Sequence, residues 1–337
     1  MRGRQVVLTS RPVGMPTEQD FRLLDCEVPE PLPGEVLLRV EYASVDPYMR
    51  TKMIDAVSYT EPYRIGDVIS GRSICTIELS ADDRFATGDL VSAFTGWQTH
   101  AVLAADQVTH IDNTVAPAPA FLGVLGMPGL TAYGGLLKFG RPVPGETLVV
   151  AAALGPVGAT VAQIARNLGL HVVAIAGGPE KTAILRDRFG MDAVIDHRAI
   201  DFEQQLESVT PDGIDIYFEN VGGAVAEAVL PRLNRYGRIP VCGMVARYND
   251  HGEVAGPDRL PGFYRQVLAK SLDVRGFISS EFADELQDNF RADMSHWVRT
   301  GAVRHLEHET AGLENAPAAL MGMLRGDNIG KTVVRVS

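Results

Sequence analysis

The most constraining feature of the sequence is a glycine-containing turn between an apolar run and a helical pattern. The run Leu148–Ala152 is continuously apolar, as expected for a strand that is buried on both faces of a sheet. The turn that follows, residues 153–158, reads Ala-Leu-Gly-Pro-Val-Gly, and apolar residues then recur at helical spacing as far as Leu168. This strand–turn–helix arrangement is typical of a dinucleotide-binding site, with alanine replacing the first glycine.

Each glycine in this turn has a physical purpose if a dinucleotide binds there. Gly155 would let the backbone approach a pyrophosphate, and Gly158 would let the helix pack closely on the sheet. The start of the helix would supply N–H groups and positive potential. The alternative is an ordinary turn between strand and helix. The sequence therefore predicts these pyrophosphate-binding residues: Gly155, Pro156, Val157 and Gly158.

The pattern around this turn predicts two kinds of domain. Before about residue 120, short strand-like runs are broken by glycine-containing turns, which suggests a barrel or sandwich. From about residue 146, apolar runs alternate with helical stretches, which implies a doubly wound parallel sheet. The predicted strands are 148–152, 171–176, 192–196, 214–218 and 239–242, and the predicted helices are 157–168, 180–189, 202–209, 224–234 and 262–270.

The tail, from about residue 304, is expected to return to strand character, and Lys331–Val336 alternates in a way that fits an edge or barrel strand. The nucleotide domain is therefore expected to be inserted into the barrel domain. The expected division is 1–122 for the substrate domain, 123–303 for the nucleotide domain, and 304–337 for the return to the substrate domain.

The second predicted strand indicates which nicotinamide cofactor is used. An NAD site usually has a carboxylate at the end of this strand, but residues 174–178 read Ala-Ile-Ala-Gly-Gly. Lys181 follows directly, and the third predicted strand ends at His197-Arg198. Cations without an acid suit the extra phosphate of NADPH. The alternative is that Lys181 is simply solvated, although a cation in the first turn of a helix is slightly unfavourable.

Composition excludes several other classes of protein. The formal net charge of the 337 residues is -11, which disfavours binding to a nucleic acid. The longest apolar run, 147–154, is too short to span a membrane, and the N-terminus lacks the apolar stretch of a signal peptide. The three cysteines form no Cys-x-x-Cys pair, so we expect a reduced, cytoplasmic protein.

Several further segments give the chain a family resemblance over nearly its whole length. It resembles the zinc-independent medium-chain dehydrogenase/reductases, in the group of the prostaglandin reductases (leukotriene B4 dehydrogenases), alkenal double-bond reductases and curcumin reductases. Segments 196–198 and 313–317 lean towards the bacterial NADPH-dependent curcumin reductase branch. The other segments that carry the resemblance are 44–50, 126–133, 219–223, 238–244, 275–278 and 326–331.

The resemblance implies a Rossmann doubly wound parallel sheet inserted into a GroES-like β-barrel domain, and a homodimer. Zinc-dependent relatives have a Cys near the position of Ser44 and Gly-His-Glu where this chain has residues 70–72, Ser-Gly-Arg. With three scattered cysteines and eight scattered histidines, we expect no metal site. The implied enzyme is an oxidoreductase acting on CH–CH groups, which uses NADPH to reduce the C=C bond of small α,β-unsaturated ketones and aldehydes.

The resemblance also implies roles for individual residues. The hydride goes to the β-carbon, a proton is added at the α-carbon, and Tyr248 is the expected donor to the enolate oxygen. Tyr48, with Tyr59 and Tyr63, would line the substrate pocket. Either Tyr48 or Tyr248 could instead be a packing or surface residue. The expected cofactor-binding residues beyond the glycine turn are Lys181 and His197 at the phosphate, Asn220 at the ribose, and Cys242, Gly243, Met244, Tyr248, Phe277, Ile278, Ser279 and Asn328 around the nicotinamide half.

Two other functions stay open at this point. The first is a quinone reductase, which would use the same fold and the same cofactor. The second is a protein that binds NADPH without catalysing a reaction, since a fold alone does not fix an activity.

Overall fold

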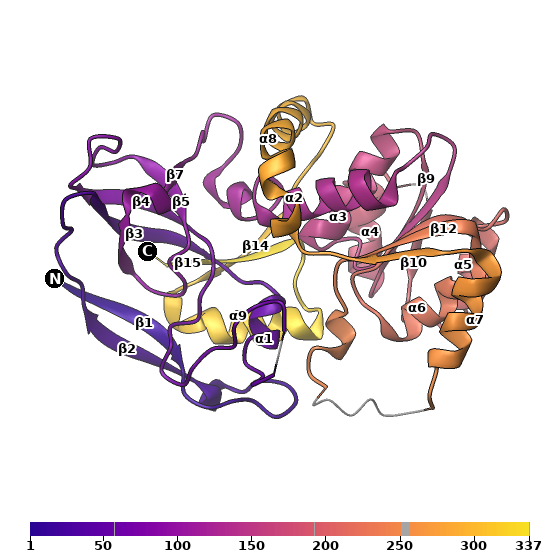
Figure 1. Cartoon of the computed structure of the whole chain (residues 1–337), viewed down its shortest axis with the longest axis horizontal. Coiled ribbons are helices and arrows are strands. Elements are labelled where there is room, and N and C mark those ends of the chain that lie inside the picture. The colour runs from indigo at the N-terminus through magenta and orange to yellow at the C-terminus, as the bar shows by residue number, and fades with distance from the viewer. Residues whose placement is uncertain (57, 192, 251–256, 337) are drawn as a thin grey trace. The chain divides into compact units, whose positions relative to one another are not determined.

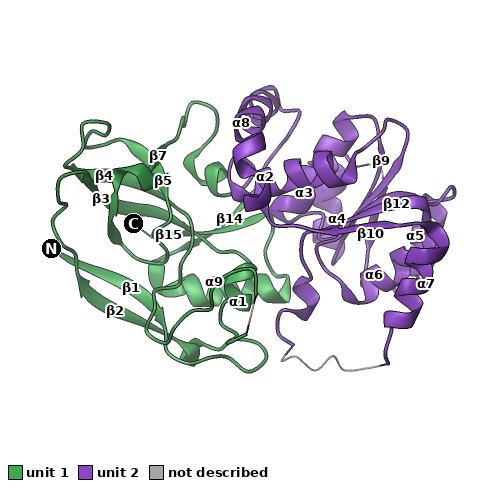
Figure 2. Ribbon diagram, in the orientation of Figure 1, with its two compact units in different colours: residues 1–122, 307–337 green, residues 123–306 purple. Residues whose placement is uncertain are grey.

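The chain folds into two compact units. The computed structural model describes residues 1–56, 58–191, 193–250 and 257–336. Unit 1 comprises residues 1–122 together with the chain from Glu307 onward, and unit 2 comprises Gly123–Leu306 (Figure 2). Unit 2 is therefore an insertion into unit 1. Within the described residues, none of the helices is both long enough and apolar enough to cross a membrane.

Unit 2 is built on a six-stranded sheet in which every neighbouring pair is parallel (Figure 1). The strand order is β10-β9-β8-β11-β12-β13, so the winding of the chain reverses between β8 and β11. This confirms the predicted doubly wound parallel sheet, in which ligands bind at the carboxyl ends of the strands beside the reversal. The strands are β8 (Thr147–Val150), β9 (His171–Ala176), β10 (Ala193–Asp196), β11 (Ile214–Phe218), β12 (Leu233–Val241) and β13 (Asp273–Gly276).

Helices cover both faces of this sheet because its central strands are apolar on both sides. Val149 and Val173 belong to a core cluster that includes side chains of α5 and α6, while α3 and its neighbour α2 lie on the opposite face. The helices are α2 (Met127–Gly134), α3 (Pro156–Asn167), α4 (Pro179–Asp187), α5 (Phe202–Val209), α6 (Gly223–Val229), α7 (Leu260–Lys270) and α8 (Ala283–Thr300).

Unit 1 is mainly antiparallel. A seven-stranded sheet runs β14-β15-β3-β4-β5-β7, with β6 paired to β3, and β1 and β2 form a separate pair. Strand β3 contacts β4 along one edge and both β6 and β15 along the other. The elements are β1 (Arg2–Leu8), β2 (Phe21–Glu27), β3 (Glu35–Ser44), α1 (Tyr48–Thr51), β4 (Ser73–Ser80), β5 (Leu90–Ala93), β6 (His100–Ala104), β7 (Thr109–His110), β14 (Glu307–Ala311), α9 (Ala316–Arg325) and β15 (Lys331–Arg335).

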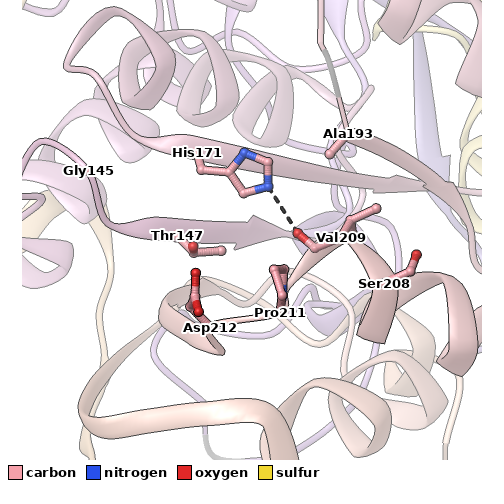
Figure 3. Close-up of a pocket in the computed structure, with 8 residues that line it drawn as sticks. All are labelled: Gly145, Thr147, His171, Ala193, Ser208, Val209, Pro211 and Asp212. Atoms are coloured by element: carbon pink, nitrogen blue, oxygen red, sulfur yellow. Dashed lines mark hydrogen bonds between the residues drawn. The ribbon is translucent and has the colours of Figure 1, made fainter.

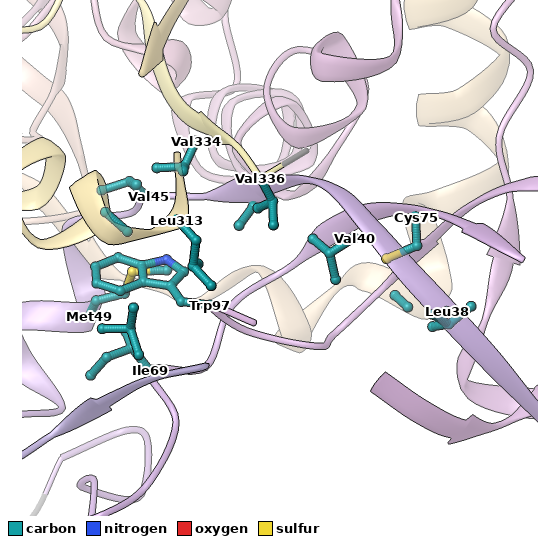
Figure 4. Close-up of a cluster of buried hydrophobic side chains, with 14 of the residues drawn as sticks. Leu38, Val40, Val45, Met49, Ile69, Cys75, Trp97, Leu313, Val334 and Val336 are labelled. Atoms are coloured by element: carbon teal, nitrogen blue, oxygen red, sulfur yellow. The ribbon is translucent and has the colours of Figure 1, made fainter. Parts of the chain in front are cut away.

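The core of unit 1 uses both ends of the chain. Trp97 is fully buried and lies beside Met49 and Ile69, and Leu313 and Val334 from the C-terminal segment belong to the same cluster (Figure 4). The indole Nε1 of Trp97 donates to the carbonyl oxygen of Ser44 at 2.9 Å. The C-terminal segment therefore completes the unit and is not an appended tail.

Several predicted elements differ in their extent. The strand expected over 239–242 is β12, which already begins at Leu233 and ends at Val241. The helix expected over 224–234 ends at Val229, and a short 3-10 turn leads directly into β12 at Leu233. Pro231 lies in that turn, where it has no N–H to continue an α-helix. The strand expected over 192–196 is β10, from Ala193, and Asp192 lies outside the described residues.

Candidate functional site

The turn between β8 and α3 approaches the sheet so closely that it requires glycine. A Cβ on Gly158 would lie 2.4 Å from the carbonyl oxygen of Ala152, which no side chain tolerates, whereas one on Gly155 would lie 3.3 Å from the same atom. Gly155 is the N-cap of α3, and Pro156 and Val157 begin the helix. The first N–H groups of a helix lack partners within it, so this turn can bind an anionic group.

The next turn, between β9 and α4, gathers positive charge. The side chains of His197 and Arg198 lie against Gly177, where a Cβ would be 2.7 Å from His197 Nε2 and 2.9 Å from Arg198 Nε. Lys181 stands in the first turn of α4. Burial, followed by the charges of Arg198 and Lys181, lowers the pKa of His197, and Asp196 opposes this change. Two permanent cations and an imidazole therefore meet at one turn, which suits a phosphate group.

Asp196 fixes the geometry of this turn. Its Oδ1 accepts hydrogen bonds of 2.9 Å from the backbone N–H groups of both Gly178 and Arg198. Burial alone would raise the pKa of the Asp196 carboxyl, but these hydrogen bonds and the neighbouring cations lower it. The carboxylate is thus engaged with the backbone.

The carboxyl end of β11 lies beside that of β8, at the reversal of the winding. Asn220 donates from Nδ2 to the carbonyl oxygen of Ala151 at 2.8 Å, which ties the two strand ends together. The buried Glu219 carboxylate accepts from the N–H groups of Val221 at 2.6 Å and Gly222 at 2.9 Å. This stretch is therefore held in one conformation next to the glycine turn.

The segment after β12 brings a tyrosine to the same edge of the sheet. The Tyr248 hydroxyl lies against the backbone of Gly243, and Met244 N–H donates to it over 3.4 Å. Cys242 is not suited to act as a nucleophile, because desolvation and the charge of Glu219 raise the pKa of its thiol to about 12. The Tyr248 hydroxyl is a polar group that this segment can offer to a ligand.

Residues 277–279 follow β13 at the same edge. The Phe277 ring is buried in a cluster with Phe139, Phe218 and Phe282. Ile278 and Ser279 are half-buried and lead into a short 3-10 turn. The Phe277 side chain thus serves the core, which leaves the backbone and the two following residues to meet a ligand.

Unit 1 contains the predicted Tyr48 and Asn328. Tyr48 begins α1 directly after Pro47, and burial together with the negative charge of Asp46 raises the pKa of its hydroxyl. Its hydroxyl therefore stays protonated at neutral pH. Asn328 lies between α9 and β15 and donates from Nδ2 to the carbonyl oxygen of Gly330 at 2.8 Å.

The other two tyrosines predicted for the pocket differ in exposure. Tyr63 is buried, its hydroxyl donates to the carbonyl oxygen of Ser70 at 3.2 Å, and burial raises its pKa to about 12. Lys52 Nζ lies 4.7 Å from the centre of the Tyr63 ring and donates to Ser70 Oγ at 3.2 Å. Tyr59 is 57% exposed, so it is the more accessible of the two.

A depression of about 560 Å³ lies at the opposite edge of the unit 2 sheet (Figure 3). Thr147, His171 and Ala193, the first residues of β8, β9 and β10, line it. His171 Nε2 is paired with the carbonyl oxygen of Val209 at 3.0 Å. This is the amino edge of the strands, whereas α/β sheets bind ligands at the carboxyl edge, so it is not the candidate site.

Arg198 enters the sequence analysis only as one of the cations near the second predicted strand, without a role of its own, and the structure places its guanidinium against Gly177. The signal was its position beside His197, at the end of a predicted strand. Among the side chains that the structure describes, no three His, Cys, Asp or Glu residues come together in a way that could hold a metal ion.

Known proteins are similar to this chain along its length. Residues 4–111 match a family model described as the N-terminal domain of oxidoreductase, and residues 156–298 match one described as zinc-binding dehydrogenase. The NADPH-dependent curcumin reductase of Escherichia coli (strain K12) is 46% identical, over 100% of this chain and 97% of that protein. Prostaglandin reductase 1 of Sus scrofa is 38% identical, over 99% of each.

A solved structure is similar over the same extent. The crystal structure of CurA in complex with NADPH from Vibrio vulnificus has a TM-score of 0.94 and 46% identity, and the match covers 99% of each chain. With the family models, this likeness confirms the predicted fold class, a Rossmann sheet with a GroES-like domain.

Proposed function

The chain belongs to the zinc-independent medium-chain dehydrogenase/reductases, and from this premise we propose that it uses NADPH to reduce the C=C bond of α,β-unsaturated ketones and aldehydes. The observation that carries the proposal is a pair of adjacent turns at the carboxyl edge of one sheet. One turn offers helix N–H groups beside Gly158, and the other offers the cations around Gly177. Together they suit a dinucleotide with an additional phosphate.

The two turns have distinct roles towards the cofactor. Gly155–Gly158 would hold the pyrophosphate, and Asn220 would lie at the ribose. Lys181 and His197 would hold the 2′-phosphate. We add Arg198 to them because its guanidinium, like the His197 ring, lies against Gly177. Asp196 is bound to backbone N–H groups, so it does not replace the ribose-binding acid of an NAD site.

The residues of the chain would stabilise charge at the substrate. When bound, NADPH supplies the hydride that reaches the β-carbon. Negative charge then develops on the carbonyl oxygen, and the Tyr248 hydroxyl would donate a hydrogen bond to that oxygen. Proton addition at the α-carbon completes the reduction. Residues 242–244 and 277–279, with Asn328, would surround the nicotinamide half, and Tyr48 would line the substrate pocket.

We further propose that the protein is a cytoplasmic homodimer joined through the sheet of unit 2. Strand β13 is at the edge of the sheet, and all four of its residues are exposed. Helix α7 exposes Leu260, Tyr264 and Leu268, which are four positions apart and so share one face. All three cysteines are free thiols, which agrees with a reducing compartment. Sedimentation is expected to give twice the mass of the chain.

Parallel assays test the proposed reaction. NADPH oxidation is measured with an enone such as 3-buten-2-one and, separately, with 1,4-benzoquinone. We expect faster turnover per enzyme with the enone, and its product should be the saturated ketone. Faster quinone turnover would favour a quinone reductase. Tight NADPH binding without turnover across a series of enones would favour a binding protein instead.

A further inference from the structure

A buried ion pair in unit 1 has no part in the chemistry described above. Lys331, the first residue of β15, is 2% exposed, and Asp46, which follows β3, is 5% exposed. Lys331 Nζ donates to Asp46 Oδ1 at 2.6 Å and to the carbonyl oxygen of Val45 at 2.7 Å. The other oxygen of Asp46 accepts from the hydroxyl of Ser44.

These contacts fix the end of β3 from several directions. Val45 N–H donates to the carbonyl oxygen of Thr332 at 3.2 Å, and Ser44 N–H donates to that of Arg72 at 2.9 Å. Trp97 holds the carbonyl of Ser44 from the core. The backbone that leads into Pro47 therefore has one conformation, set by segments from both ends of the chain.

Stability alone is a weak reason to keep such a pair. Removing two charges from water is costly, and apolar residues of similar size often serve a core equally well. An ion pair does impose direction, because Lys331 must meet both the Asp46 carboxylate and the Val45 carbonyl. The pair thus fixes the position of Asp46 more narrowly than apolar packing would.

The position of Asp46 sets the start of α1. Met49 N–H donates to the carbonyl oxygen of Asp46 at 3.1 Å, so the first turn of this four-residue helix begins on Asp46. Tyr48 is the first residue of α1, and Asp46 is also the largest charged influence on its hydroxyl. Without Lys331, an unpaired carboxylate would remain two residues before Tyr48.

We propose that Asp46 and Lys331 are positioning residues that hold Tyr48 in place for the substrate. The proposal rests on the substrate-facing role proposed above for Tyr48. Neither residue of the pair touches the reacting atoms, and both act through the backbone between Asp46 and Tyr48.

A double-mutant cycle in the full-length enzyme tests this coupling. Lys331→Met is expected to lower kcat/KM for 3-buten-2-one by between about tenfold and a hundredfold, the usual cost of misplacing a group that meets the substrate. The Kd for NADPH should stay within about twofold, since the proposed pyrophosphate, ribose and 2′-phosphate contacts lie in unit 2 and Asn328 is the one proposed cofactor contact in unit 1. In a Tyr48→Ala background, Lys331→Met should cause no further loss. An equal loss in both backgrounds overturns the proposal.

A spectroscopic measurement tests the same proposal without turnover. In protein labelled with 3-fluorotyrosine, the Tyr48 resonance is assigned by its disappearance in Tyr48→Phe. Lys331→Met should shift this resonance, and an unmoved resonance overturns the proposal even if the wild-type enzyme reduces no enone. Failure of the positioning role is therefore distinguishable from failure of the proposed function.

Two further variants control for folding and for charge burial. Asp46→Asn keeps the size of the side chain and an acceptor for Lys331, so it replaces Lys331→Met if that variant does not fold. It should lower kcat/KM for 3-buten-2-one and shift the Tyr48 resonance in the same directions, by smaller amounts. Arg238→Met breaks the ion pair with Glu146 in unit 2, where both side chains are largely buried. It should lower the thermal midpoint but leave the Tyr48 resonance unmoved, and a shift there overturns the specific role of Lys331.

Discussion

In unit 2, the glycine turn lies so close to the backbone of Ala152 that a single methyl group at Gly158 would collide with it. In unit 1, the backbone before Tyr48 is held by the charges of Asp46 and Lys331. The first region is shaped by the absence of side chains, and the second by two side chains that meet in the core. The first should therefore be sensitive to added volume, and the second to lost charge.

The glycine turn and the ion pair also differ in how much of the chain determines their geometry. The glycine turn in unit 2 is a short continuous segment, so one substitution within it changes the geometry of the whole turn. The ion pair in unit 1 joins residues 285 positions apart. Its geometry therefore depends on the correct assembly of β3 against β15, and it forms only when the unit is complete.

The largest effect is expected from Gly158→Ala. The added Cβ would lie 2.4 Å from Ala152 O, so α3 must move away from the turn. We expect a loss of NADPH affinity of about 3 kcal/mol, roughly a hundredfold, measured by calorimetry, and a lower thermal midpoint. Gly155→Ala is the matched control, because its added Cβ would lie 3.3 Å from the carbonyl oxygen of Ala152. It should leave the midpoint nearly unchanged, and an equal fall in both variants would contradict the account of Gly158.

The next largest effect, on kcat, is expected at Tyr248 in unit 2. Tyr248→Phe removes the hydroxyl that lies against Gly243 and Met244. If that hydroxyl donates to the enolate oxygen, kcat should fall roughly a hundredfold, the usual cost of one such donor. NADPH affinity should change little, since the ring remains. Steady-state kinetics with 3-buten-2-one decide this, and unchanged turnover would remove Tyr248 from the mechanism.

A smaller effect is expected at the cationic turn. Lys181→Ala and Arg198→Ala should each weaken NADPH binding by about 1.5–3 kcal/mol, the contribution of one charged hydrogen bond. Binding of NADH, which lacks the 2′-phosphate, should be unaffected. Calorimetry with both cofactors measures the ratio. An unchanged preference in Arg198→Ala would mean that its guanidinium only packs on Gly177.

The regular part of the fold was predictable because it repeats a local pattern. Continuous apolar runs such as that of β8, alternating with helical spacing, indicate a parallel sheet without further information. Strand β13 was not predicted, because residues 273–276 read Asp-Val-Arg-Gly and are all exposed, so they carry no apolar signal. The tail was predicted as strand, yet α9 occupies Ala316–Arg325 between β14 and β15.

The candidate site also has a part that the sequence predicts and a part that it does not. The glycine turn was predictable because the close approach of the turn to the backbone of Ala152 requires glycine, and glycine can be read from the sequence. The structure adds the contact of Arg198 with Gly177, which depends on how two neighbouring strands end. No local sequence pattern predicts the Asp46–Lys331 pair, because a single Asp and a single Lys are each most often solvated surface residues. The roles assigned to Tyr48, Tyr248 and the other site residues remain predictions.

Glu219 is a buried carboxylate in unit 2 that holds the backbone, so this part of unit 2 depends on a charged side chain, as the end of β3 in unit 1 does. Burial raises its pKa, although the N–H groups of Gly222 and Val221 act in the opposite direction. Below its ordinary pKa, the carboxyl is protonated in both the folded and unfolded states and carries no penalty. As the pH rises through the raised folded-state pKa, the unfolded state ionises more readily, so stability is lost.

Glu219→Gln keeps an oxygen acceptor for Val221 and Gly222 but cannot ionise. Its unfolding free energy relative to the wild type should therefore increase as the pH rises above the ordinary carboxyl pKa, because only the wild type carries the penalty. The gain should be on the order of 1 kcal/mol, the usual scale of one buried hydrogen-bonding change. Urea unfolding of both proteins at several pH values measures the difference. A pH-independent difference would mean that the Glu219 carboxyl acts as a neutral acceptor whose charge does not affect stability.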